Sequence, residues 1–152
     1  VPETNFYEIL YDHHMSDPKY GMGARDHVPY IAYKFRNYGK TPGILKEIGL
    51  GMMLSTDPVD CVYSSQITSF PEFMVGAGEA TQVRSFEFYS PLDATQAEAI
   101  IKNEARLWVF GKLDYLDVMG NAHIHRFYFR TVYWDGSCVL QPYDHKHYNE
   151  ST

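Results

Sequence analysis

The stretch Val109–Phe127 reads VFGKLDYLDVMGNAHIHRF, and it decides the class of fold. Apolar and polar side chains alternate on both sides of Met119-Gly120-Asn121, a sequence typical of a tight turn between antiparallel strands. Extended outward, the same pattern predicts two paired strands, over residues 106–116 and 122–134. This long hairpin indicates a β-rich, antiparallel protein.

The flanking segments repeat the period of two that marks half-buried strands. Asp135-Gly136 predicts a second tight turn, leading into a strand that starts at Ser137. Gly49 and Gly51 predict a β-bulge or a close approach of another group to the backbone. Besides the long hairpin, we expect strands or short extended elements at residues 5–11, 28–37, 44–54, 73–75, 83–89 and 137–140.

One segment changes from the period of a strand to that of a helix. Asp93 stands three positions before Gln96, which is the spacing of a capping box. Apolar side chains follow at the intervals that place them along one side of a helix. Together these features predict one short helix over residues 94–103.

About seven strands with regular turn signals and one inserted helix predict an immunoglobulin-like antiparallel β-sandwich. A small closed β-barrel is the alternative, because alternation does not distinguish the two. The length of 152 residues fits a single domain over residues 1–152, with a loop-rich N-terminal segment (1–27) and a polar tail (141–152). We expect the core to contain Ile31, Tyr33, Phe35, Ile48, Leu50, Phe86, Phe88, Val109, Leu113, Phe127 and Phe129.

Charge and hydropathy exclude some classes of partner. The chain has a net charge of -6, and its 13 Lys and Arg residues are scattered, which argues against nucleic-acid binding. The sequence contains no apolar run long enough to span a bilayer. Membrane contact would therefore need a segment absent from this chain, and the expected partner is a protein or a small molecule.

Histidines offer the strongest candidate for chemistry. His123 and His125 stand two apart on a predicted strand, so both imidazoles share a face and could bind one zinc or other transition-metal ion. The alternative is that each lies hydrogen-bonded at the edge of the core, and no carboxylate follows within residues 126–133. Asp114 and Asp117 flank the turn, where we expect Asp117 to cap it. No cofactor is predicted, and the metal remains the alternative.

Nothing in the sequence identifies a catalytic nucleophile. No serine lies in a Gly-x-Ser-x-Gly elbow, and neither cysteine has an adjacent His or Lys to activate it. Cys61 and Cys138 could form a disulfide in an oxidising compartment, or they could remain as two buried free thiols. We therefore expect no catalytic residue.

Two motifs resemble a group of uncharacterised proteobacterial proteins that are anchored in a membrane. Residues 37–42, NYGKTP, are similar to the N-x-G-x-T-P stretch of that group. Residues 109–120, VFGKLDYLDVMG, are similar to its V-x-G-x-I-x-Y-x-D-x-F-G stretch. The resemblance spans roughly residues 28–150 and departs at Gly43, where alanine is usual, and at Met119, where an aromatic residue is usual.

The resemblance implies a β-rich extracytoplasmic domain that follows one or two transmembrane helices, and hence a periplasmic location. It implies no activity. The expected function is a non-catalytic binding or interaction module. The alternatives are a small-ligand sensor with an aromatic-lined pocket and a metal binder or metalloenzyme that uses His123 and His125. An exposed apolar patch would favour the binding module, whereas an interior cavity would favour the sensor.

Overall fold

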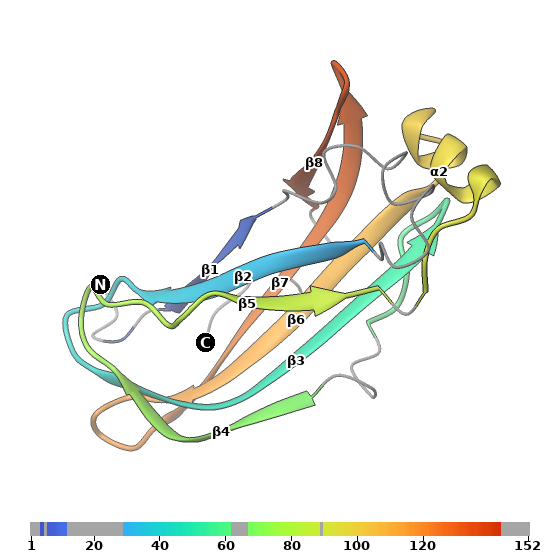
Figure 1. Ribbon diagram of the computed structural model, residues 1–152. Coiled ribbons are helices and arrows are strands. Elements are labelled where there is room, and N and C mark those ends of the chain that lie inside the picture. The colour runs from blue at the N-terminus through green and yellow to red at the C-terminus, as the bar shows by residue number, and fades with distance from the viewer. Residues whose placement is uncertain (1–3, 5, 12–28, 62–66, 89, 144–152) are drawn as a thin grey trace.

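The computed structural model describes residues 4, 6–11, 29–61, 67–88 and 90–143, and these form two antiparallel sheets (Figure 1). The smaller sheet has the order β1-β2-β5, and the larger has the order β4-β3-β6-β7-β8. The predicted mainly-β class with antiparallel sheets is confirmed. The strands are β1 (Phe6–Tyr11), β2 (Tyr30–Asn37), β3 (Gly43–Ser55), β4 (Ile67–Val75), β5 (Arg84–Glu87), β6 (Arg106–Leu116), β7 (Ala122–Trp134) and β8 (Ser137–Pro142).

The larger sheet is built around the hairpin of β6 and β7, whose bounds agree with the prediction. Its strands are long and curved (Figure 1). Within the described residues β4 and β8 form the two edges, so this sheet stays open. β4 begins at Ile67 and is longer than the predicted element at 73–75, in a segment where Pro71 had weakened the strand signal.

The helix α2 (Ala94–Ile101) begins with the predicted capping box. The Gln96 backbone N–H donates to Asp93 Oδ1 at 2.8 Å, and the Asp93 N–H donates to Gln96 Oε1 at 3.0 Å. Ala97 and Ile100 are the helix's buried residues. Among the described residues, no helix has the length and apolar character needed to cross a membrane.

One core lies between the two sheets and takes side chains from both. Every residue predicted to point inward belongs to it, with Phe129 partly buried at its margin. The faces of the sheets meet through aromatic contacts, such as Phe35 on β2 with Phe127 on β7 at 6.1 Å between ring centroids. Alternation along the strands therefore predicted this interior correctly.

The outer face of the larger sheet carries a second cluster, which the alternation did not predict. Trp108, Phe110 and Tyr128 are at most 1% exposed there. The segment after β3 covers them, because Val59 donates its N–H to the Tyr128 hydroxyl at 2.9 Å and accepts from it at 2.8 Å. We call these three side chains the outer cluster. Both faces of this part of the sheet are thus buried.

Two glycines let aromatic rings lie against the strands. A Cβ at Gly51 would stand 2.1 Å from Phe110 Cε2, and one at Gly111 would stand 2.2 Å from Phe127 Cζ. The close approach predicted at Gly51 is confirmed. The irregularity in β3 lies instead between Leu45 and Glu47, where the register shifts against both neighbouring strands.

The buried amide of Asn37 joins the sheets at one end. Its Nδ2 donates to the carbonyls of Thr41 at 2.8 Å and Val75 at 3.2 Å, and its Oδ1 accepts from the Gly39 N–H at 2.9 Å. The side chain is fully buried. It therefore links the end of β2 to the β2–β3 turn and to the end of β4, which belongs to the other sheet.

Replacement of Gly111 by alanine should destabilise the fold by about 1–3 kcal/mol, because the new methyl group overlaps a buried ring that has little room to move. Chemical denaturation measures the change. In a Phe127→Leu background the same substitution should cost less, since the smaller side chain leaves space for the methyl group. Equal costs in the two backgrounds would contradict this account of Gly111.

Asn37→Ala should lower the free energy of unfolding by about 2–4 kcal/mol, since it leaves buried backbone groups without partners. Asn121→Ala is the matched control, because Asn121 is exposed and its side chain makes one 3.2 Å hydrogen bond. Urea denaturation measures the two free energies of unfolding. Similar losses of stability for the two variants would show that Asn37 does not link the two sheets.

Candidate functional site

The β2–β3 turn, the β6–β7 turn and the end of β4 lie together at one end of the molecule (Figure 1). We call this region the turn end. Ile44 at the start of β3 pairs with Met74 on one side and with Leu116 on the other, so the three strands reach this end side by side. The loop ends of a β-sheet protein are a common place for binding residues. The turn end is therefore a candidate binding site.

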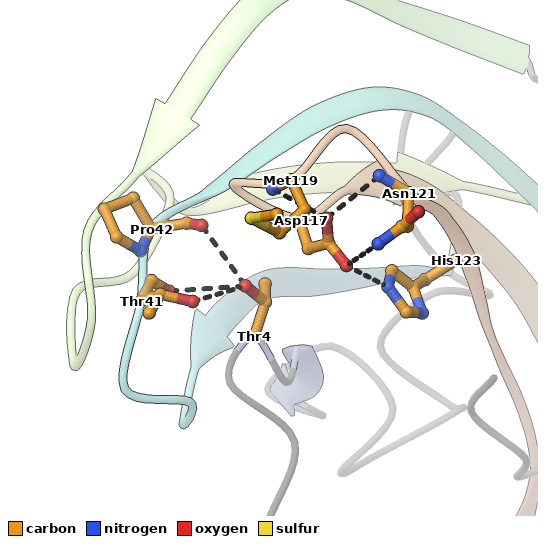
Figure 2. A network of polar contacts seen from close by, with 7 residues as sticks. All are labelled: Thr4, Thr41, Pro42, Asp117, Met119, Asn121 and His123. Carbon is orange, nitrogen blue, oxygen red and sulfur yellow. Dashed lines mark hydrogen bonds and ion pairs between the residues drawn. The ribbon is translucent and has the colours of Figure 1, made fainter.

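Thr4 contacts the β2–β3 turn (Figure 2). Its Oγ1 lies 3.0 Å from Thr41 Oγ1 and donates to the carbonyl of Pro42 at 3.2 Å. Thr4 is 4% exposed. The turn that contains Tyr38 is thus held from inside by Asn37 and from the side by Thr4.

Asp117 caps the β6–β7 turn, as predicted (Figure 2). Its Oδ1 accepts from the backbone N–H groups of Met119 and Asn121, both at 2.9 Å. Its Oδ2 lies 2.9 Å from His123 Nε2. Gly120 completes the turn with a φ of 83°, a conformation that favours glycine. Asp114, the other carboxylate, lies 3.7 Å from Lys112 on the same strand.

These contacts stabilise the ionised form of Asp117. The hydrogen bond from His123, with that from the Asn121 N–H, lowers the pKa of Asp117 to about 2 from an ordinary 3.8. Because the folded pKa lies below the unfolded one, the resulting stabilisation is present above pH 3.8 and is lost as the pH falls toward 2. The carboxylate is thus used to hold a turn.

His123 and His125 share the inner face of β7, as their spacing predicted, and the structure gives them different surroundings. His123 contacts Asp117 and stacks on Tyr115 at 5.3 Å between centroids. His125 is 2% exposed and stacks on Phe127 at 6.3 Å. In the part of the chain that the structure describes, no group of three or more His, Cys, Asp or Glu side chains could hold a metal ion. His13, His14, His27, His145 and His147 lie outside the described residues.

Neither cysteine forms a disulfide in this structure, and the two lie in different clusters. Cys138 is buried in the core between the sheets, whereas Cys61 packs against the outer cluster. The larger sheet separates these two environments. The disulfide considered from the sequence is therefore not formed in this structure, because the two side chains face opposite sides of the sheet.

Large apolar side chains are exposed at the turn end, and the sequence pattern did not predict them as a group. Tyr38 is 55% exposed, Met74 62%, Val118 50% and Met119 78%. Each belongs to a turn or to a strand end that the contacts of Asn37 or Asp117 hold in place. Their sequence signal was weak, since isolated apolar residues in turns are common.

Comparisons with known proteins give no family for the chain. No protein-family model matches it, and no curated protein matches it. A solved structure described as "X-ray structure of Northeast Structural Genomics Consortium target SoR45" is similar with a TM-score of 0.38 and 8% sequence identity, over 95% of each chain. A likeness of that degree carries no functional argument.

Asp117→Asn should lower stability at neutral pH, because a neutral amide oxygen accepts the hydrogen bonds from His123 and from the backbone N–H groups less strongly than a carboxylate does. Urea midpoints measured from pH 7 to pH 2 should show the advantage of the wild type shrinking below pH 3.8 and vanishing near pH 2. Asp114→Asn is the control and should show a smaller difference, since its carboxylate has a longer contact. A constant difference between wild type and Asp117→Asn down to pH 2 would refute the role of the charge.

Proposed function

We propose that this chain is a non-catalytic binding module and that the turn end is its contact surface. The observation that carries the proposal is the exposure of Tyr38, Met74, Val118 and Met119 on segments held by buried or capped contacts. Exposed apolar side chains that gather in one region mark interaction sites. Methionine and tyrosine are also enriched at protein–protein interfaces, so the partner that we propose is a protein.

The fixed conformation of the turns supports a role in binding for the apolar side chains that they expose. A contact surface that is already ordered loses less conformational entropy when a partner binds. The β6–β7 turn has its backbone held by Asp117, with Gly120 N–H donating to the Asp117 carbonyl at 3.0 Å. Val118 and Met119 therefore project from a defined loop, and a partner need not order that loop.

The placement of the polar groups supports a role without catalysis. Asp117 accepts four hydrogen bonds, from Met119, Asn121 and His123, which leaves little capacity for a substrate. His125 lies in the core against Phe127. The aromatic side chains that a ligand pocket would need pack on one another, such as Tyr33 on Phe35 at 5.9 Å and Trp108 on Tyr128 at 5.7 Å between centroids.

The setting that we propose follows from the resemblance alone. The chain would be the extracytoplasmic, periplasmic part of a membrane-anchored bacterial protein, with the anchor in a segment outside this sequence. The fold type that we propose, an immunoglobulin-like sandwich, rests on the pattern of strands and turns in the sequence and not on the resemblance. The motif residues Asn37, Gly39, Asp117 and Gly120 hold turns in this structure, which fits a resemblance in fold rather than in activity.

Site-specific photo-crosslinking in cells tests the contact surface. A benzoylphenylalanine at position 118 should give a discrete product with a partner protein, and Met119→Ser in the same chain should weaken that product, because it removes apolar contact area. A benzoylphenylalanine at position 134 is the matched control, since Trp134 is also exposed but lies on the β7–β8 hairpin. Equal labelling from both positions, or none from position 118, would contradict the proposal.

A further inference from the structure

Two arginines lie side by side on the outer face of the larger sheet. Arg130 on β7 pairs with Trp108 on β6, and Arg106 stands two positions before Trp108 and so shares its face. We call Arg106 and Arg130 the arginine pair. It adjoins the outer cluster, at the opposite end of β6 from the turn end.

Both guanidinium groups have a buried N–H donor for which the described residues provide no acceptor. Arg106 Nη1 and Arg130 Nε are inaccessible to solvent, and neither has a hydrogen-bond partner among the described residues. Arg130 Nη2 donates to Gln141 Oε1 at 3.4 Å, a long contact. A buried donor that lacks an acceptor destabilises a protein, so this arrangement favours an acceptor supplied from elsewhere.

The electrostatics of the arginine pair also favour an acceptor supplied from elsewhere. Burial, together with repulsion from Arg130, lowers the pKa of Arg106, and the nearby Tyr143 only partly opposes this. Arg130 lies over the Tyr143 ring, with Cζ 4.9 Å from the ring centroid, which shields one side of the guanidinium from water. The ion pairs found within the described residues involve Lys102, Lys112 and His123, so none of them neutralises the arginine pair.

We infer that the arginine pair is a binding site for an oxyanion, either a carboxylate or a phosphate. Guanidinium groups present several N–H donors in one plane and match the oxygens of these anions closely. One oxyanion beside Arg106 and Arg130 would accept from their guanidinium N–H groups and offset the repulsion between the two charges. The site is separate from the turn end, so this inference does not depend on the proposed function.

The two anions share one recognition chemistry, and they can come from different sources. Phosphate or a small carboxylate can bind from solution. A carboxylate can also belong to the chain itself, since Asp144 directly follows Tyr143 in the sequence and Glu150 lies a few residues further. A variant of the full chain with Asp144→Asn and Glu150→Gln separates these sources.

Thermal unfolding of the full chain in inorganic phosphate or acetate tests the site, with sodium chloride at equal ionic strength as the reference. We expect the Tm to rise and level off with one of the two anions but to stay flat in chloride. Arg106→Gln or Arg130→Gln should weaken the apparent affinity by about tenfold or more, because each removes half of the donors. Lys112→Gln is the matched control, since Lys112 lies on the same strand and pairs with Asp114, and it should leave the response unchanged.

A second measurement does not depend on the stability of any variant. In ¹H–¹⁵N spectra of the wild-type protein, the Nε–H signal of Arg130 should shift during a phosphate or acetate titration, and that of Arg36 on β2 should shift less. If only the Asp144→Asn/Glu150→Gln variant responds, a carboxylate of the chain itself is the ligand in the wild type. That outcome also supports the site. The inference is overturned if neither protein responds to either anion, or if the arginine variants respond like the wild type.

Discussion

A single buried amide, that of Asn37, connects the two sheets where the turns meet. The backbone N–H of Asn37 donates to the Glu79 carbonyl at 2.9 Å, while its side chain reaches the carbonyls of Thr41 and Val75. A buried residue whose backbone and side chain find partners on the β2–β3 turn and on the segment at and after the end of β4 fixes the relative positions of these segments, because any displacement would leave a polar group unsatisfied. The position of Tyr38, and with it one side of the turn end, follows from this constraint.

Most of the fold could be predicted because its strands obey one simple rule. Side chains alternate between the faces of a strand, so the apolar period identified the inner face of β2, β3, β6 and β7 and the residues of the core. The helix was equally clear, since the capping box of Asp93 and Gln96 is local in sequence. The strand β4 was predicted too short because Pro71 interrupts its pattern.

What could not be predicted depends on contacts between segments distant in the sequence. The run Leu107-Trp108-Val109-Phe110 is apolar on both faces, a signal for burial on both sides, yet only the structure identifies the segment around Val59 as the cover. The same limit applies to the histidines. Their spacing correctly placed them on one face, but the role of His123 depends on Asp117 across the turn.

The outer cluster also alters the surroundings of the arginine pair. Surface arginines are ordinarily solvated, and water screens the repulsion between two of them. Arg130 instead lies against the Tyr143 ring, and Tyr143 in turn packs edge-on against Trp108 at 5.0 Å between centroids. Where aromatic rings replace water, the interaction between charges strengthens because the local dielectric falls. A chain with a net charge of -6 that keeps two cations together in such surroundings has the electrostatics of an anion site rather than of a solvated surface.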